Sequence, residues 1–466
     1  LLEKIKGSYC SCTISDTLPG SIFLVKSGQQ GLYVGNSVDR YYFSSDVYGL
    51  VEESYNFFKI EDDCYINLPN NPKSELLITI YNNNKQKIIN QKKFKEIGLN
   101  LNDIYLGNKP HYYFKEFLES ESIIRKTNAQ YLSTKNLENI NMSKFKELKN
   151  FILKNKIRKI IITGMGTCYT AAVAISQYMR EIVTNHTNLN LVIQPHIASE
   201  GSGFYTNKDM NDHLIIVLGQ SGTTIDTNTY AKIGKQEGAY TVSFLNKRQG
   251  DLSYLVDLNL YVGNGRDVEI SVPSTKTYLA HVVIGYIFTL MLIKNKYNQK
   301  LINKEKNKLL NIPKIIKKQI NNVQKYNFDK LTDIFCKNPN WYIVYDDSKL
   351  SVTNNEIKIK LSELCYQSIP TFNIKYSIIL KIKNSIIIFN SAEKYINLRN
   401  YINILLERNN TILIVSSDLK FNLIKHNNLF LYNQIYNERN FEIFNYIIFF
   451  QYFAYCLAIK LNKRFE

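Results

Sequence analysis

The pattern of apolar and polar residues changes near residue 145 of this 466-residue chain. The first 95 residues contain short stretches of alternating apolar and polar side chains, such as "SIFLVKS" at 21–27, separated by Gly, Pro and Asp. This alternation predicts β-strands joined by turns. From 96 to 145 we expect a linker and lead-in helices, because the apolar residues within 109–132 recur at helical spacing.

Beyond residue 145, an apolar strand, a polar loop and a helical segment follow one another repeatedly. "RKIIITGMGTCYTAAVAISQYMREI" at 158–182 contains all three, and "HLIIVLGQSGTTIDTNTYAKIGKQEG" at 213–238 repeats them. A second series begins with "NWYIVYDD" at 340–347. The alternation predicts an α/β fold with two doubly wound units and parallel sheets, which we place at 146–310 and 311–466.

Two long apolar runs, 279–293 and 446–459, interrupt this pattern. Each reaches about 15 residues, whereas roughly 20 are needed to span a bilayer. We therefore expect two buried helices and no membrane partner.

Charge and cysteine content add little to this prediction. The formal net charge of +18 is spread along the chain, with Lys residues set among Ile and Asn as an A+T-rich coding sequence would produce, so nucleic-acid binding is not predicted. The seven cysteines are scattered, without a Cys-x-x-Cys pair or a His at zinc-site spacing. We expect a reduced, cytoplasmic protein without a metal site.

The loops that follow the strands carry the candidate chemistry. In parallel α/β sheets ligands bind beyond the carboxyl ends of the strands, where helix N-termini favour phosphate. Loops 164–168 (GMGTC) and 220–224 (QSGTT) stand at such ends, and 274–276 (STK) precedes an apolar helix. Helix capping is the alternative role for these hydroxyl groups. None of the loops has a nucleotide-binding pattern, and no cofactor is predicted.

Together these motifs resemble a known family. "GMGTCYTAAVA", "LGQSGTTIDT" and "VPSTKTY" are similar, in order and spacing, to the sugar-phosphate loops of the glutamine–fructose-6-phosphate amidotransferases, whose isomerase half carries two sugar isomerase (SIS) units. "KPHYYFKEFLES" resembles the helix that opens this half. Residues 41–63 resemble the end of the family's glutaminase domain, so the resemblance implies that 1–95 is the remnant of an α+β hydrolase domain.

The resemblance also implies site residues. Carried over residue by residue, the phosphate site would consist of Thr167, Cys168, Gln220, Ser221, Gly222, Thr224, Ser274 and Thr275. In "NNEIKIKLSELCY", Glu356, Lys360 and Glu363 stand where the family has its catalytic Glu, Lys and Glu. Their spacing puts them on one helical face. A solvated face with Glu–Lys pairing is the alternative.

The implied reaction makes glucosamine 6-phosphate from fructose 6-phosphate and glutamine in a cytoplasmic homodimer. Its isomerisation step needs a base that moves a proton between neighbouring carbons. Glu363 is the candidate base. Lys360 would assist proton transfer to the sugar hydroxyl or stabilise developing negative charge.

Several departures from the family pattern point to a second hypothesis, a catalytically impaired SIS protein that binds sugar phosphates or regulates. Cys168 and Gly219 replace serines, and Tyr376 replaces the ring-opening His. A tyrosine, with an unperturbed pKa of about 10, is a poorer proton shuttle at neutral pH than a histidine. The chain starts at Leu1 and stops at "LNKRFE", without the family's N-terminal Cys nucleophile or its Lys-containing tail. We therefore expect a truncated chain that does not hydrolyse glutamine.

Overall fold

The computed structural model describes residues 5–28, 31–69, 76–80, 86–89, 93–132, 142–154, 156–203, 209–248, 250–295, 297–345, 351–391, 395–433 and 441–464. Its contacts divide the chain into two compact units, Leu1–Gly107 and Asn108–Glu466. Each unit is described by itself. The predicted boundaries at residues 95, 145 and 310 stay predictions.

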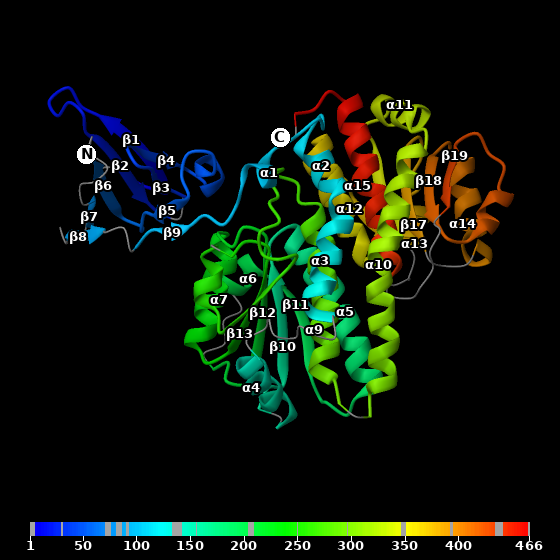
Figure 1. Cartoon of the computed structure of the whole chain (residues 1–466). Helices are drawn as coiled ribbons and strands as arrows, with labels where there is room; N and C mark the ends of the chain where they lie inside the picture. Colours follow the sequence, from blue (N-terminus) through cyan, green and yellow to red (C-terminus); the bar gives the residue numbers. More distant parts are fainter. Residues whose placement is uncertain are drawn as a thin grey trace. The chain divides into compact units, whose positions relative to one another are not determined.

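The first unit consists of two antiparallel sheets (Figure 1). One has the strand order β1-β2-β6-β7-β8 and the other β4-β3-β5-β9. Leu24 and Ile66 of the first sheet pack with Val34 of the second in one buried cluster. The elements are β1 Tyr9–Ile14, β2 Ile22–Ser27, β3 Tyr33–Asn36, β4 Tyr41–Ser44, the 3-10 helix Val47–Leu50, β5 Asn56–Lys59, β6 Cys64–Leu68, β7 Leu76–Ile80, β8 Gln86–Ile89, β9 Lys95–Glu96 and α1 Leu101–Ile104.

The second unit contains two parallel five-stranded sheets, as the alternation of strands and helices predicts. The first has the order β11-β10-β12-β13-β14, and the second has the order β16-β15-β17-β18-β19. In both, the first strand along the chain lies between the second and the third. The strands are β10 Lys159–Gly164, β11 Val192–Ile197, β12 His213–Gly219, β13 Tyr240–Leu245, β14 Leu258–Tyr261, β15 Trp341–Tyr345, β16 Thr371–Asn373, β17 Ile386–Ser391, β18 Thr411–Ser416 and β19 Leu429–Asn433.

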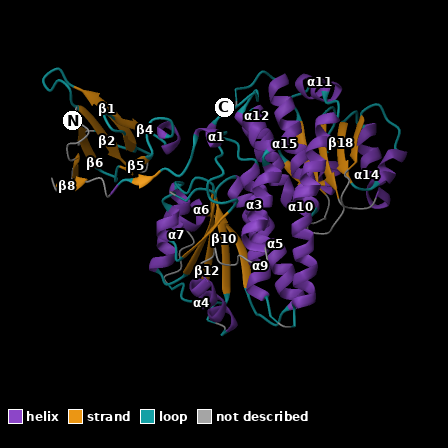
Figure 2. Ribbon diagram, viewed as in Figure 1, coloured by secondary structure: helices purple, strands orange, loops and turns teal. Residues whose placement is uncertain are grey.

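A layer of helices lies between these two sheets (Figure 2). It contains α2 Tyr112–Leu118, α3 Ser120–Leu132, α5 Thr167–His186, α9 Lys276–Ile293, α10 Gln299–Lys325, α11 Asp329–Lys337, α12 Ser351–Cys365 and α15 Glu442–Lys460. The other helices are α4 Met142–Leu153, α6 Ala198–Gly203, α7 Ile225–Gln236, α8 Leu252–Leu255, α13 Ile374–Ile379, α14 Tyr395–Glu407 and the 3-10 helix Leu419–Leu423. One continuous core reaches from Ile160 through the helical layer to Ile343.

The two apolar runs form α9 and α15 within this layer. Both are long and apolar enough to cross a membrane, but most of each lies buried inside the unit. The prediction of buried helices is confirmed. Because α12 packs against both α15 and α5, its position relative to the first sheet is fixed.

Candidate functional site

The candidate site lies where the order of the first sheet reverses. Strands β10 and β12 are neighbours, but their connections lead to opposite sides of the sheet, and such a switch point opens a crevice at the carboxyl ends of the strands. Thr167 begins α5 shortly after β10, and Gln220 directly follows β12. The first two predicted loops therefore lie at this switch point.

The loops are joined through Cys168. Its sulfur accepts a hydrogen bond from the backbone amide of Gln220 and lies 4.0 Å from Nδ1 of His281 on α9. Burial raises the pKa of the Cys168 thiol to about 12. The side chain is thus a neutral thiol in the place where the family resemblance implies a serine.

The loop after β12 presents hydroxyl groups at the switch point. The hydroxyls of Ser221 and Thr223 lie 2.8 Å apart, while Thr224 is exposed at the N-terminus of α7 and makes no capping hydrogen bond. Gly222 has a φ of 72°, and a Cβ there would lie 2.9 Å from Cα of Gly250. Only glycine fits this close approach without a backbone shift.

The third predicted loop is folded around Glu269. This buried carboxylate accepts hydrogen bonds from the hydroxyl of Ser274 at 2.8 Å and from the amide and hydroxyl of Thr275 at 2.7 and 3.1 Å. The backbone carbonyl of Glu269 accepts a hydrogen bond from Nε2 of Gln220. Ser274 and Thr275 thus reach the site, but their hydroxyls already have an acceptor.

Helix α12 brings a charged face to the same place. Glu356 and Lys360 are fully buried, with Nζ of Lys360 3.6 Å from Oε1 of Glu356 and 2.8 Å from Oε2 of the partly exposed Glu363. Burial raises the pKa of Glu356 to about 7 despite the opposing charge of Lys360. Burial also opposes the charge of Lys360, but Glu356 and Glu363 outweigh it and raise the pKa. The alternative of a solvated helix face is wrong for Glu356 and Lys360.

Two threonines of α5 connect this face to the first loop. The hydroxyl of Thr167 lies 3.4 Å from Oε1 of Glu356, and the hydroxyl of Thr170 lies 2.6 Å from Oε2. The charge of Glu269 also acts on Lys360. The structure therefore brings the first loop, the third loop and α12 together.

Sequence reasoning missed three polar residues of this cluster. Besides Thr170 and Glu269, Glu116 on α2 is buried and accepts hydrogen bonds from the amides of Ile270 and Ser271. Glu116 lies in "KPHYYFKEFLES", the segment that resembles the family's opening helix, but no role was predicted for it. Thr170 and Glu269 carry no signal in a single sequence.

Tyr376 is the predicted residue that stands apart. It lies on α13 with 59% of its surface exposed. Helix α13 packs against α14 and the second sheet.

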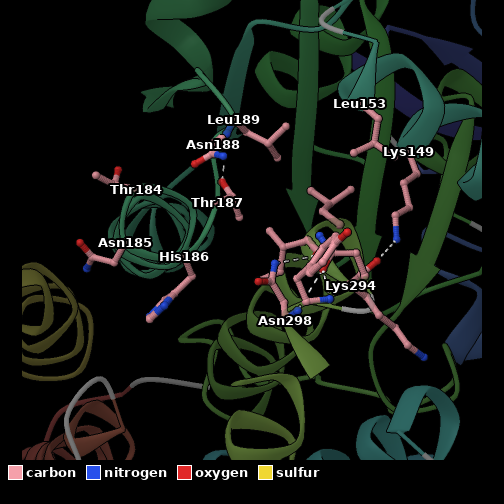
Figure 3. A pocket seen from close by; sticks show the side chains of 14 residues that line it. Lys149, Leu153, Thr184, Asn185, His186, Thr187, Asn188, Leu189, Lys294 and Asn298 are labelled. Carbon is pink, nitrogen blue, oxygen red and sulfur yellow. Dashed lines mark hydrogen bonds between the residues drawn. The ribbon is translucent and has the colours of Figure 1, made fainter. Parts of the chain in front are cut away.

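A separate pocket of about 720 Å³ lies at the opposite end of the first sheet, where α5 and α9 end (Figure 3). Two of its polar side chains cap the end of α9. Nζ of Lys149 donates to the carbonyls of Met291 and Lys294, and Nδ2 of Asn298 donates to the carbonyl of Ile293. Across the described residues, no group of three or more His, Cys, Asp or Glu side chains is arranged to hold a metal ion.

Comparison with known proteins agrees with this architecture. Residues 153–291, from the end of α4 to α9, match the SIS domain family. The structure resembles the C-terminal domain of glucosamine-fructose-6-phosphate aminotransferase from Francisella tularensis, with a TM-score of 0.66 and 19% identity over 77% of this chain and 99% of that one. The structure also resembles a Clostridium difficile protein that has been proposed to be a phosphosugar isomerase. The TM-score is 0.59 and the identity is 17%, over 75% of this chain and 92% of that one. These likenesses support the fold.

Curated relatives extend the similarity beyond the matched domain. The glutamine–fructose-6-phosphate aminotransferase of Fusobacterium nucleatum is 27% identical over 402 residues, which is 83% of this chain and 61% of the relative. The enzyme of the same name from Clostridium acetobutylicum is 28% identical over 320 residues, 67% of this chain and 48% of the relative. The chain spans about half to three fifths of the length of these relatives. Residues 153–291 therefore match the SIS domain, and most of the chain is similar in sequence to the glutamine–fructose-6-phosphate aminotransferases.

Proposed function

We propose that this chain binds a hexose 6-phosphate at the switch point of its first sheet and carries the isomerising part of a glutamine–fructose-6-phosphate aminotransferase. The whole reaction would make glucosamine 6-phosphate from fructose 6-phosphate, with nitrogen from glutamine. The observation that carries the proposal is the contact between Thr167 and the buried Glu356, which joins a phosphate-type loop to the charged face of α12.

The phosphate would lie between the N-termini of α5 and α7. Amide groups and the positive ends of helix dipoles favour an anion there. Thr167 and Ser221 would add hydroxyl donors, and the exposed Thr224 has no capping bond to give up. Neutral donors hold the phosphate without bringing a further cation to the reacting carbons.

The sugar would extend from the phosphate toward α12. Glu363 would take a proton from the carbon next to the carbonyl group and return it to the neighbouring carbon, which converts ketose and aldose forms through an enediol. Lys360 is held by Glu363 at 2.8 Å, and its pKa is raised. It is therefore better suited to stabilise developing negative charge than to give up a proton.

A second candidate is a protein that binds sugar phosphates without turnover. Two observations favour it. The hydroxyls of Ser274 and Thr275 are already bound to Glu269, and Tyr376, the residue in the place of the ring-opening His, is exposed on α13. A homodimer and a cytoplasmic location remain proposals for either function.

Ligand binding is tested by melting the chain with and without fructose 6-phosphate or glucose 6-phosphate. A ligand that binds only the folded chain raises the melting temperature. The double substitution Ser221→Ala and Thr224→Val is expected to abolish the rise. Thr184→Val, at the other end of α5, removes an exposed hydroxyl far from the loops and should leave it intact. A rise retained by the double variant would show that the phosphate binds elsewhere.

Turnover is tested by following deuterium exchange from D₂O into fructose 6-phosphate by NMR. Exchange at C1, the carbon from which the isomerisation removes a proton, and its loss in Glu363→Gln with binding preserved, would support isomerisation. Binding without exchange would support the second candidate.

A further inference from the structure

The two carboxylate oxygens of Glu356 have unequal surroundings. Oε2 lies 2.6 Å from the hydroxyl of Thr170, within the range of a strong hydrogen bond. Oε1 has only longer contacts, 3.4 Å to the hydroxyl of Thr167 and 3.6 Å to Nζ of Lys360. Lys360 lies closer to Glu363, at 2.8 Å. The only short polar contact that the described structure gives the buried Glu356 is therefore with a hydroxyl group.

The hydroxyl of Thr170 has two acceptors but one proton. Its second acceptor is the backbone carbonyl of Thr167, at 2.9 Å. If Glu356 is ionised, Thr170 donates its hydrogen to Oε2. Its oxygen then faces the carbonyl oxygen of Thr167 without a hydrogen between them. If Glu356 carries a proton on Oε2, that proton is donated to Thr170, and Thr170 donates its own to the carbonyl. Only the protonated carboxyl satisfies both contacts.

The protonation state of Glu356 also affects the binding of a phosphate at the first loop. An ionised Glu356 competes with a bound phosphate for the single hydroxyl proton of Thr167, and its charge repels the anion across a buried space. A protonated Glu356 removes the repulsion and leaves the Thr167 hydroxyl available to the ligand. Binding of a dianion at the N-terminus of α5 therefore favours the protonated form.

Several charged and titratable groups surround Glu356. Glu116, whose pKa burial raises to about 8, also titrates near neutral pH, but it contacts the third loop rather than Glu356. On its own helix it faces Lys360 and Glu363. Its charge acts on Cys168 of α5, whose pKa is about 12, and on two tyrosines with pKa values raised well above the ordinary one, Tyr113 of α2 and Tyr278 of α9. Helix α15 carries its acidic and basic residues at its two ends, and the titratable residues of β15 and β16 are Tyr342 and Tyr345.

We propose that binding of a sugar phosphate is coupled to the uptake of one proton by Glu356, and that Thr170 is the positioning residue that partners this carboxyl group in both protonation states. This inference rests on the proposed function, because it needs the phosphate to bind at the first loop. Burial, which raises the pKa of Glu356 to about 7, puts the coupling in the neutral range. Affinity then falls as the pH rises above 7, by up to tenfold per pH unit.

The test is calorimetry of glucose 6-phosphate binding at pH 8 in two buffers with different ionisation enthalpies. A phosphate monoester has a second pKa of about 6, so the ligand itself takes up little proton there. Because Glu356 with a pKa of about 7 is mostly ionised at pH 8, we expect the wild type to take up as much as about 0.9 proton per ligand. Glu356→Gln should bind with uptake near zero and with an affinity that no longer falls between pH 7 and 8. Glu121→Gln on α3 is the matched control and should keep the wild-type uptake.

The Thr170 variants separate positioning from a structural role. Thr170→Ser keeps the hydroxyl and should behave as the wild type. Thr170→Val removes the donor that stabilises the ionised form, so the pH above which affinity falls should move upward and the uptake at pH 8 should decrease. An equal loss of affinity at every pH, with no shift, would overturn the role of Thr170.

The outcomes also separate this inference from the proposed function. Binding heat that is independent of the buffer, or full uptake in Glu356→Gln, would overturn the coupling and leave ligand binding in place. Absence of binding heat at every pH in the wild type would overturn both.

Discussion

Oε1 of Glu116 lies 2.5 Å from the amide nitrogen of Ile270, so the opening helix α2 holds the start of the third loop through a buried carboxyl group. Burial, reinforced by the charge of Glu269, raises the pKa of Glu116 to about 8. A carboxyl group whose pKa is raised by folding makes its full contribution to the unfolding free energy below its unfolded pKa. This contribution is lost as the pH rises through the folded pKa.

We therefore predict that Glu116→Gln makes the chain less sensitive to alkaline pH. The wild type should lose on the order of a few kcal/mol of unfolding free energy between pH 5 and pH 9. The variant should lose measurably less, since its amide oxygen still accepts the amide bonds without a charge to bury. Urea denaturation across this range measures the difference, with Glu121→Gln as the control. Parallel pH curves for wild type and Glu116→Gln would contradict the prediction.

Cys168→Ser is predicted to tighten sugar-phosphate binding about fivefold, the equivalent of one net hydrogen bond of about 1 kcal/mol. A hydroxyl is a better donor than the neutral thiol and still accepts from the amide of Gln220, as the sulfur does. Calorimetry with glucose 6-phosphate measures the gain, and Cys336→Ser at an exposed cysteine of α11 should leave the affinity unchanged. Unchanged affinity in Cys168→Ser would mean that residue 168 does not face the phosphate.

The sequence predicted most of the second unit because its signals are local. The apolar run of β12, the glycine after it and the helical pattern of α7 specify one strand, loop and helix without help from distant residues. The edge strands β11, β14, β16 and β19 were missed. Three to six residues of mixed polarity become a strand only when a neighbouring strand supplies the hydrogen bonds.

The site was predictable only in part for a related reason. Glu356, Lys360 and Glu363 share a helical face by spacing alone, but the burial of Glu356 and Lys360 depends on packing against other helices such as α5. Thr170 gains its role from a contact with Glu356, which is 186 positions away along the chain. Glu269 gains its role from Ser274, which is 5 positions away. Such pairings cannot be predicted from a single sequence. Buried polar groups that hold loops in place are therefore the residues of a site that are most easily missed.

Glu269→Ala is predicted to unfold the third loop and to abolish sugar-phosphate binding. The substitution leaves the amide and hydroxyl of Thr275 and the hydroxyl of Ser274 without their acceptor. Hydrogen bonds to a charged group contribute about 1.5–3 kcal/mol each, so we expect a loss of at least about 3 kcal/mol in unfolding free energy. Protease cleavage within the loop gives a local readout, and Glu53→Ala at an exposed site of the first unit is the control. A stable loop in Glu269→Ala would show that the backbone alone fixes its shape.

Lys360→Met is predicted to destabilise the chain much more at pH 9 than at pH 6. At pH 9 the variant holds an ionised Glu356 in a buried place without its cation, and breaking a buried ion pair in this way costs about 3–5 kcal/mol. At pH 6 a carboxyl group with a pKa of about 7 or higher is largely protonated, so the loss of the cation matters less. Urea denaturation at the two pH values measures the difference. The double substitution Lys360→Met and Glu356→Gln removes both charges and should recover most of the stability at pH 9. If the double variant is as unstable as Lys360→Met alone, the packing of the lysine chain, rather than its charge, is what the buried face of α12 requires.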